Sequence, residues 1–452
     1  MGSLSEVPEL LALDCPVHVI RVPDQIDVPF TDRVKRLIDT EAFRRLSEIP
    51  QLGLVSLVYP GATHTRFEHS LGVYRNTLLF VRQLDRRGGL STVSKRQIEC
   101  LLLAALFHDI GHWPFCHPIE DLGLDRIPSH ETFAAQYLRS GEISDLIHEE
   151  WETTPEEVVR LLAGDHTDPE SKVLRSILSG PIDVDKMDYL YRDSLHAGVP
   201  YGRNFDAPRL IGSLVLNESM DGIAITTKGR TAAELMVFAR YVMFSEVYWH
   251  HAVRSATAMF QRAFYEWYEQ GADAGDNLWM QDAPYELVGR VGNVDSPSAS
   301  QQLTADLFGP RRLLHKRWVS FSCFDHEEAY RMIAQKPYPW LVQCGNQLSF
   351  LLSKELGMPI DSHEILIDAP PVGLEVQFHV QVANAGLNEF RPLGEISPVV
   401  SALATRQFDD FVKQVRVFVS RRLSEPLKQL DGVAWLLRAA SQVDGNAGRP
   451  SA

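Results

Sequence analysis

Apolar residues recur at three- and four-residue spacing over most of the first 270 positions, which predicts a succession of amphipathic helices. The clearest examples are 33–49, 66–84, 96–109 and 129–140. The pattern breaks at 214–229, where two short apolar runs flank Asp221-Gly222 and predict a β-hairpin. A long helical stretch is expected to follow over 231–267. The fold class that this pattern indicates is mainly α.

The remaining segments have a different character. Residues 1–30 mix prolines with β-branched runs such as VHVIRV, which favours an extended N-terminal arm or small strands. The helical domain is expected to span 31–270, and the small polar residues of 271–310 predict a hinge or linker. Over 311–440, strand-like runs (RWVSFSCF, EILIDAPP, LEVQFHVQV) alternate with helical ones such as QFDDFVKQVRVFVSRRL, which predicts a smaller C-terminal α+β lobe. The tail, 441–452, is expected to be disordered.

Composition narrows the class of protein. A chain of 452 residues exceeds one compact core, and its formal net charge of -15 argues against a nucleic-acid partner. Five cysteines without CxxC spacing indicate a reducing, cytoplasmic setting. The apolar run LLLAALF at 101–107 is too short to span a membrane, and the N-terminus has no signal-peptide pattern. We therefore expect no membrane association.

The candidate chemistry starts at the adjacent pair His108-Asp109, within LFHDIGHWPFCH. Neighbouring residues within a helix point about 100° apart, but at a helix end both can turn toward one cation. The chain leaves the predicted helix through Ile110-Gly111, so the pair can share a metal ion. Imidazole and carboxylate together suit a divalent transition metal such as Mn, Fe, Co, Ni or Zn, with Mg as an additional candidate.

Two further segments supply the remaining ligands of the expected metal site. His69 lies on an amphipathic helix three residues after Arg66. Asp185, Tyr189 and Asp193 recur every four residues, so one helical face carries two carboxylates and a phenol. Such a face is costly to bury unless its acids are paired or bind a metal.

A second group of polar residues surrounds these positions. His112, His117, Glu120 and His130 follow the pair closely, and imidazoles near a metal can position water or transfer protons. Positive charge comes from Arg66, Lys186, Arg192 and Arg240. Metal, histidines and cations together are what phosphoryl transfer requires.

Each part also has a structural interpretation. A lone histidine on an amphipathic helix is usually a packed or surface residue, and His112 and His117 could simply cap a helix end. Asp185 and Asp193 could lie on a solvated face beside Lys186. Cys116 could be proposed as a nucleophile, but a small packing residue is the simpler interpretation. The joint occurrence of these residues in an apolar context favours a site.

The segments DTEAFRRLSEIPQLG, YPGATHTRFEHSLGV, HDIGHWPFCH and DVDKMDYLYRD resemble the HD superfamily of metal-dependent phosphohydrolases. Within it they are most similar to the deoxynucleoside triphosphate triphosphohydrolases, in the branch of the animal sterile-alpha-motif-plus-HD enzyme. The resemblance covers about 31–270 and implies an HD-domain helical core. It also implies a homo-oligomer, as a dimer or tetramer, and a nucleotide substrate.

The resemblance assigns roles residue by residue. The metal ligands fall on His69, His108, Asp109 and Asp185. The catalytic histidine and its acidic partner fall on His117 and Glu120, and further active-site histidines on His112 and His130. Triphosphate contacts fall on Arg66, Lys186, Tyr189 and Arg240, sugar contacts on Tyr189 and Asp193, and the segment that reads the 3′-hydroxyl on Gln51 and Leu52. The implied reaction is water attack at the α-phosphorus, which gives deoxynucleoside and triphosphate.

Departures from the family pattern leave alternatives open. No sterile-alpha-motif domain is recognisable, Ser47 replaces an arginine of the nucleotide effector site, and Phe244 replaces a histidine of the substrate pocket. One alternative is an HD phosphohydrolase that acts on another nucleotide phosphoester. Another is a regulatory nucleotide-binding protein with little turnover, although the complete ligand set argues against it. A nuclease is disfavoured by the acidic balance.

Overall fold

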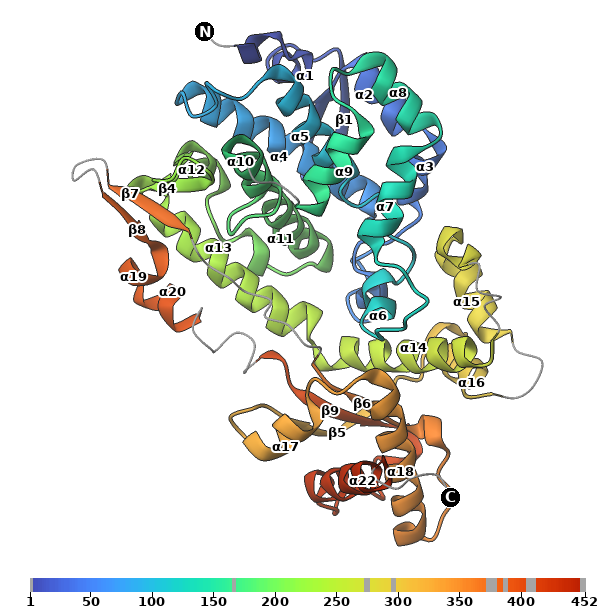
Figure 1. Ribbon diagram of the computed structural model, residues 1–452. Coiled ribbons are helices and arrows are strands. Elements are labelled where there is room, and N and C mark those ends of the chain that lie inside the picture. Colours follow the sequence, from blue (N-terminus) through green and yellow to red (C-terminus); the bar gives the residue numbers. More distant parts are fainter. Residues whose placement is uncertain are drawn as a thin grey trace. The chain divides into compact units, whose positions relative to one another are not determined.

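The structure is a computed structural model that describes residues 3–164, 168–271, 277–293, 298–370, 380–384, 389–403 and 412–447. It is mainly α, as the sequence pattern predicts (Figure 1). The chain forms two compact units. Unit 1 comprises 1–113, 128–243 and 377–405, and unit 2 comprises 114–127, 244–376 and 406–452.

Unit 1 begins with short elements and a two-stranded sheet. After η1 (Ser3–Glu6) and α1 (Pro8–Ala12), strands β1 (His18–Val22) and β2 (Ile26–Phe30) pair antiparallel, which confirms strand structure in the predicted arm. The next turns of helix are capped by threonines: the Thr31 and Thr40 hydroxyls accept the backbone N–H of Val34 and Phe43.

The helices of unit 1 follow in chain order. They are α2 (Asp32–Ile38), α3 (Glu41–Arg44), η2 (Arg45–Ser47), η3 (Gly53–Leu57), α4 (Arg66–Arg86), α5 (Lys95–Phe107), α7 (His130–Arg139), α8 (Glu142–Glu150), α9 (Pro155–Ala163), α10 (Pro169–Leu178), α11 (Val184–Ala197), η4 (Tyr201–Arg203), α12 (Ala207–Gly212), η5 (Thr227–Gly229) and α13 (Arg230–Met243). Helices α4, α5 and α11 carry or directly precede the predicted metal donors, and α4 packs against both α5 and α11.

A small mixed sheet completes unit 1. Strands β3 (Leu214–Leu216) and β4 (Ile223–Thr226) pair antiparallel on either side of Asp221-Gly222, which confirms the predicted hairpin. Strand β4 also pairs in parallel with β7 (Gln381–Asn384), and β7 pairs with β8 (Glu389–Pro392). Two short helices end this part, α19 (Leu393–Ile396) and α20 (Pro398–Ala402).

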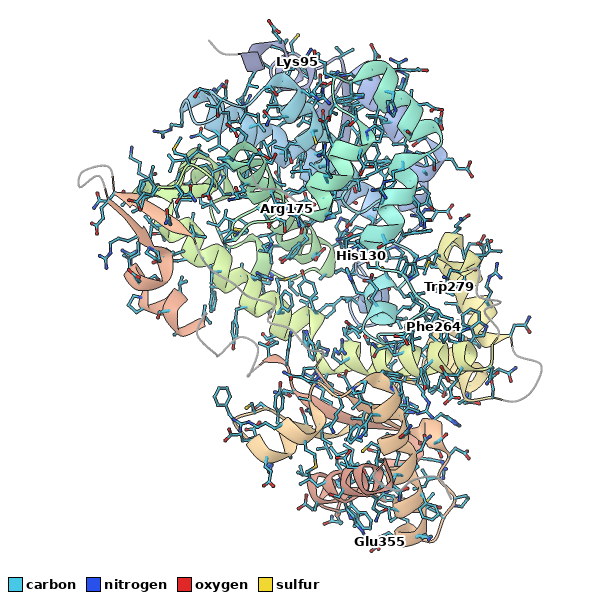
Figure 2. All side chains as sticks on the ribbon, viewed as in Figure 1. Lys95, His130, Arg175, Phe264, Trp279 and Glu355 are labelled. Carbon is cyan, nitrogen blue, oxygen red and sulfur yellow. The ribbon has the colours of Figure 1, made fainter. Side chains whose placement is uncertain are left out.

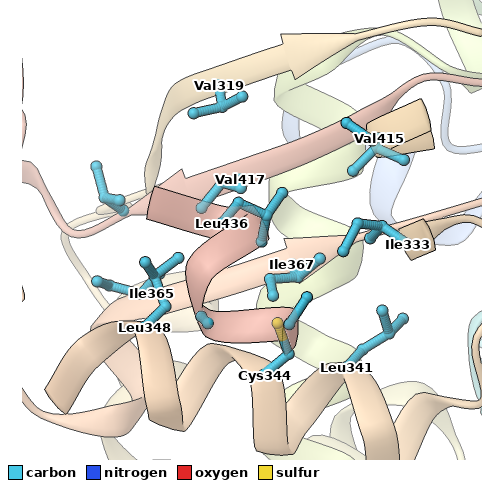
Figure 3. Packing of buried hydrophobic residues seen from close by; sticks show 14 of the residues in the cluster. Val319, Ile333, Leu341, Cys344, Leu348, Ile365, Ile367, Val415, Val417 and Leu436 are labelled. Atoms are coloured by element: carbon cyan, nitrogen blue, oxygen red, sulfur yellow. The ribbon is translucent and has the colours of Figure 1, made fainter. Parts of the chain in front are cut away.

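Unit 2 is built around a three-stranded antiparallel sheet of order β5-β9-β6, from β5 (Lys316–Phe321), β9 (Val415–Val419) and β6 (Ile365–Asp368). Its hydrophobic core includes Val417 of β9 and Ile367 of β6, together with Leu348 and Cys344 of α18 (Tyr338–Leu356) and Leu436 of α22 (Gly432–Ala447) (Figure 3).

The other elements of unit 2 are mostly helical. They are α6 (Cys116–Glu120), η6 (Phe244–Tyr248), α14 (His251–Glu269), η7 (Leu278–Gln281), α15 (Pro284–Gly292), α16 (Ala299–Phe308), α17 (Glu327–Ile333), η8 (Ser362–Glu364) and η10 (Arg421–Leu423). Aromatic rings pack along α14, where Phe264 lies 5.1 Å from Trp279 between ring centroids (both labelled in Figure 2).

Three local predictions were wrong. The expected linker 271–310 contains α15 and α16. Of the expected disordered tail 441–452, residues 441–447 belong to α22, and residues 448–452 lie outside the described residues. The sequence pattern predicts the run VRVFV as part of a helix, but it is the central strand β9, buried at all five positions. A strand that is buried on both faces has no period-two alternation, so its apolar run resembles a buried helical segment.

The expected helical stretch 231–267 is α-helical at both ends but is interrupted by one π-helical turn at Phe244–Tyr248. Among the residues that the structure describes, no helix is both long enough and apolar enough to cross a membrane.

Candidate metal centre

The His-Asp pair leaves the end of α5, as the sequence predicts. The helix begins with a capping box between Ser94 and Gln97, and its residues 98–107 are all buried. It ends at Phe107, so His108 and Asp109 lie in the turn that follows. The Nδ1 atom of His108 is 2.8 Å from the Ala105 carbonyl oxygen, which holds the ring with Nε2 on the opposite side.

Four donor groups from three helical segments converge at this turn. The Nε2 atom of His69 lies 3.2 Å from Nε2 of His108 and 3.1 Å from Oδ1 of Asp185. The Nε2 atom of His108 lies 3.5 Å from Oδ1 of Asp109 and 3.9 Å from Oδ1 of Asp185. Ligands that stand about 2.0–2.2 Å from one ion are about 3.0–3.6 Å from each other. The cluster therefore has the spacing and the donor types of a divalent metal site.

The cluster is buried on one side and reachable on the other. The side chains of His69 and Asp109 are 1% and 8% exposed, whereas that of Asp185 is 34% exposed. The carboxylate of Asp185, near the start of α11, therefore marks the side from which a substrate can reach the donors.

Asp188 orients His69 from the Nδ1 side of the ring, opposite the other donors. Its Oδ2 accepts a hydrogen bond from Nδ1 of His69 at 2.8 Å, so Nε2 of His69 faces the other donors. Arg192, one turn later on α11, donates to both oxygens of Asp188, at 2.8 and 2.7 Å. A carboxylate on the outer nitrogen of a metal-binding histidine is a recurrent arrangement that fixes the tautomer and raises ligand basicity.

Close packing between α4 and α11 makes these contacts possible. A Cβ atom at Gly72 would lie 1.9 Å from Oδ1 of Asp188 and 2.4 Å from Nη2 of Arg192. No side chain fits at that position, so glycine allows the two helices to approach.

The electrostatics of the cluster favour a cation. Burial alone lowers the pKa of His69, but its hydrogen bonds to Asp185 and Asp188 outweigh burial and raise that pKa to about 10. Burial opposes ionisation of Asp109, yet Arg66 and the neighbouring histidines hold its pKa well below the usual range. The pKa of Asp185 is also lowered, against burial, by its bond to His69. The carboxylates are thus ionised at neutral pH and attract positive charge.

The expected phosphate-binding residues lie near the donors in unit 1. Arg66 is buried and donates to Oδ2 of Asp109 at 2.6 Å. Lys186 follows Asp185 on α11, and its Nζ donates to Asp183 at 2.5 Å. Burial raises the pKa of the Tyr189 hydroxyl, and the positive charge of Arg240 on α13 acts in the opposite direction.

The expected sugar-binding residues adjoin a buried histidine. Asp193 lies 2.8 Å from Nε2 of His64, whose ring stacks on that of His196 with 4.4 Å between centroids. The backbone N–H of Gln51 donates to the His64 carbonyl oxygen at 2.9 Å, and Leu52 follows as the residue before η3.

Three buried polar atoms in this region have no hydrogen-bond partner among the described residues. They are Oε1 of Gln51, Nδ1 of His64 and Nε of Arg66. An unpaired buried polar atom costs about 1–3 kcal/mol, and such atoms at a site often mark the place of a ligand. Arg66 bonds to Asp109, and the backbone of Gln51 bonds to His64, so these unpaired atoms support the expected role of Gln51 and Arg66 in substrate binding.

The four predicted catalytic residues lie in different units: His112 and His130 belong to unit 1, and His117 and Glu120 belong to unit 2. His112 is 3% exposed, its Nδ1 lies 3.2 Å from Oδ1 of Asp109, and its ring is 4.1 Å from that of His130 between centroids. His130 is the first residue of α7 (labelled in Figure 2). His117 and Glu120 belong to α6 in unit 2, where Nδ1 and Oε2 are 3.6 Å apart. Their place beside the metal stays a prediction.

The sequence pattern did not predict two residues of the site, Asp188 and His64. Asp188 lies in the segment DVDKMDYLYRD, but it is offset from the four-residue series of Asp185, Tyr189 and Asp193. Its own partner at the same spacing is Arg192, and that second series was the available signal. For His64, the only signal was a second histidine in HTRFEH.

Comparison with protein families gives two matches. A model of the HD domain matches residues 66–193, and a model described as the HD associated region matches residues 205–430. The first includes the four donors, and the second begins after α11.

Two relatives align over more than nine-tenths of this chain, and a third over about half of it. An uncharacterized protein of Methanocaldococcus jannaschii is 30% identical over 92% of this chain and 85% of its own length. The deoxynucleoside triphosphate triphosphohydrolase SAMHD1 of Gallus gallus is 31% identical over 51% of this chain and 42% of its own length. The corresponding protein of Danio rerio is 25% identical over 91% of this chain and 70% of its own length.

Solved structures have the same fold. A hypothetical protein from Aquifex aeolicus has a TM-score of 0.69 at 27% identity, covering 91% of this chain and 98% of that one. A phosphohydrolase from Bacteroides thetaiotaomicron has a TM-score of 0.68 at 20% identity, covering 89% of this chain and 100% of that one, which shows the fold alone.

Proposed function

Because the chain belongs to the HD-domain family of phosphohydrolases, we propose that it hydrolyses deoxynucleoside triphosphates to deoxynucleoside and triphosphate. The observation that carries the proposal is the convergence of four donor residues, in which the Nε2 atoms of His69 and His108 lie 3.2 Å from each other and 3.1–3.9 Å from carboxylate oxygens of Asp109 and Asp185. The named activity of several relatives supports the choice of substrate.

The four donors would hold a divalent transition metal, which supplies positive charge for a phosphate oxygen. In the proposed reaction a water oxygen bonds to the α-phosphorus and the bond between that phosphorus and the 5′-oxygen breaks. The 5′-oxygen leaves as the deoxynucleoside hydroxyl and takes one proton. We assign that proton transfer to His117 and Glu120, with His112 and His130 positioning the water.

The rest of the site would bind the substrate. Arg66, Lys186 and Arg240 supply positive charge, and Tyr189 a hydroxyl, for the triphosphate. Oε1 of Gln51 and Nδ1 of His64 are buried and have no described hydrogen-bond partner. A sugar hydroxyl could form a hydrogen bond with either atom. Asp193 is expected on the same side, because it bonds to His64. Leu52 would contact the sugar as part of the same segment.

The test is an incubation of the full chain with each deoxynucleoside triphosphate and with Mn, Co, Ni or Mg in turn, followed by chromatography. We expect deoxynucleoside and triphosphate in equal amounts. Stepwise release of phosphate would instead indicate another nucleotide phosphoesterase, and tight binding without product would indicate a regulatory nucleotide-binding protein.

Variants test whether the reaction takes place at this metal centre. Replacing His108 and Asp109 with alanine should remove both bound metal and hydrolysis. Glu120→Ala should keep the metal and lose turnover, and His326→Ala, at an exposed histidine of unit 2, should change neither. Retention of stoichiometric metal in the double variant would contradict the proposed ligand set. Homo-oligomer formation and a cytoplasmic location stay predictions.

A further inference from the structure

A cavity lies in unit 1 beside helices α4 and α11. Its volume of about 520 Å³ is in the range of small-molecule sites. The walls come from β2, α4, α11 and residues 205–212. The residues that line the cavity include none of the four metal-donor residues, so this cavity is separate from the metal centre.

One wall of the cavity is basic. Arg75, Arg82 and Arg86 line it at spacings of seven and four residues, which places them on one face of α4. Asn76 and Gln83 of the same face also line it. Three arginines in one cavity stand out in a chain with a formal net charge of -15, and they favour an anionic occupant.

These arginines are only partly engaged within the described part of the chain. Arg75 donates through Nε to the Asp27 carbonyl oxygen at 3.0 Å and has no ion pair there. Arg82 pairs with Asp14, whose side chain is 74% exposed. Arg86 is exposed and makes no hydrogen bond or ion pair with a described residue. Burial lowers the pKa of Arg75, an effect that an anion in the cavity would oppose.

Outside α4, the lining of the cavity is mostly apolar. Its apolar residues are Ile26, Met187, Phe205, Pro208 and Ile211, and Leu79 of α4 adds to them. Tyr191 and Asp206 also line the cavity, and Oδ1 of Asp206 accepts the backbone N–H of Arg209. Asp188 also borders the cavity, but both of its oxygens already accept hydrogen bonds, from Arg192 and His69. A molecule with an anionic end and a flat or aliphatic body would therefore satisfy both walls.

We propose that this cavity is a binding site for a phosphorylated small molecule of nucleotide size. Its phosphate groups would contact Arg75, Arg82 and Arg86, and its body would pack against Phe205 and the neighbouring apolar wall. The proposal does not depend on the reaction at the metal centre. Its occupant would touch Asp188, the residue that orients His69, so the two sites share one side chain.

Calorimetric titration of the full chain with ADP tests the site. EDTA is present, so that no metal ion can hold ADP at the metal centre. We expect one ADP per chain, and at least a tenfold weaker Kd for the variant Arg82→Glu with Arg86→Glu. The matched control is Arg311→Glu with Arg312→Glu, two exposed arginines of unit 2 with the same change in charge, which should bind ADP as the wild type does.

A second variant and two further ligands distinguish the contribution of charge to ADP binding from that of the shape of the cavity. Ile211→Trp should fill the apolar side and weaken ADP binding without a change in charge. Adenosine should bind at least tenfold more weakly than ADP, and pyrophosphate should compete with ADP. Circular dichroism checks that each variant is folded. No binding of ADP by the wild-type chain, or equal loss in both double variants, would overturn the proposal.

Discussion

Asp188 connects the metal centre to the body of unit 1 through a chain of charged contacts. It accepts from His69 on one side and from Arg192 on the other. Arg192 also donates to Glu68 at 2.6 Å, and Glu68 lies 3.0 Å from Nε2 of His196. Because Asp188 and Arg192 are buried, the carboxylate has few alternative orientations, and the His69 ring is held in one tautomer.

Asp188→Asn should therefore weaken metal binding. The amide keeps the volume of the carboxylate but loses the charge that raises the basicity of His69, and its NH₂ group opposes the Arg192 donors. Loss of such an outer contact typically costs about 10–100-fold in metal affinity. Titration with Mn²⁺ would measure the change. Asp431→Asn, at an exposed helix cap, is the matched control, and an unchanged affinity for the Asp188 variant would refute the orienting role.

Gly72→Ala should disturb the same contacts by volume alone. The new methyl group would overlap Asp188 and Arg192, so α4 and α11 must separate or the ion pair must shift. Overpacking of this kind costs about 1–3 kcal/mol. Thermal unfolding would measure the loss of stability. Gly289→Ala provides the control, because its Cβ would meet no atom within 4 Å and alanine favours a helix. Equal stability of both variants would disagree with this account.

At the residue scale, the sequence predicted the donors better than their supports. The sequence motifs combine imidazole and carboxylate donors, a combination that favours a metal site. The structure brings together the donor atoms of His69, His108, Asp109 and Asp185. The support from Asp188 depends on which face of α11 meets α4. That choice is made by tertiary packing at Gly72, which spacing alone does not specify.

At the scale of elements, the turn after α5 is positioned by α7. A Cβ atom at Gly111 would lie 2.1 Å from the His130 carbonyl oxygen and 2.4 Å from the backbone nitrogen of Ala134. The backbone of α7 therefore rests directly on the turn that carries His108 and Asp109. The same approach brings the ring of His130 to 4.1 Å from that of His112, between centroids, at a tilt of 34°.

Gly111→Ala should push α7 away from this turn. Backbone atoms cannot give way as a flexible side chain can, so we expect a loss of about 1–3 kcal/mol in the free energy of unfolding, together with weaker metal binding. Chemical denaturation and Mn²⁺ titration would measure the two effects. Gly394→Ala, at a glycine with open space around it, should leave both unchanged. A Gly111 variant with normal metal affinity would mean that the turn does not need α7.

Elements with strong periodicity were predicted well, and those specified by their neighbours were not. Helices α4, α5 and α11 each carry apolar residues at helical spacing, and Ser94 and Asp183 cap the starts of α5 and α11. Strand β9 pairs with β5 and β6 on both sides, so its burial follows from long-range contacts. Likewise, nothing in the apolar pattern of 231–267 indicates a π-helical turn at Phe244–Tyr248.

At the scale of the whole molecule, a group of closely spaced carboxylates must be compensated by positive charge. Asp109, Asp185 and Asp188 meet two histidines and the cations of Arg66 and Arg192. The chain as a whole is strongly acidic, so this site adds to an existing excess of negative charge. A divalent ion would relieve that repulsion, and its binding would appear as stability of unit 1.

Saturating Mn²⁺ should therefore stabilise the chain. An ion at 100 times its Kd adds about 2.7 kcal/mol, and each kcal/mol raises Tm by about 2–4 °C in domains of about 150–250 residues. We expect a rise in Tm of roughly 5–10 °C on that basis. Hydrogen exchange should slow most in α4, α5 and α11, which carry or precede the donors, and least in the sheet of unit 2. The variant that lacks His108 and Asp109 should show neither effect. Slowing spread evenly over both units would indicate that the ion binds elsewhere.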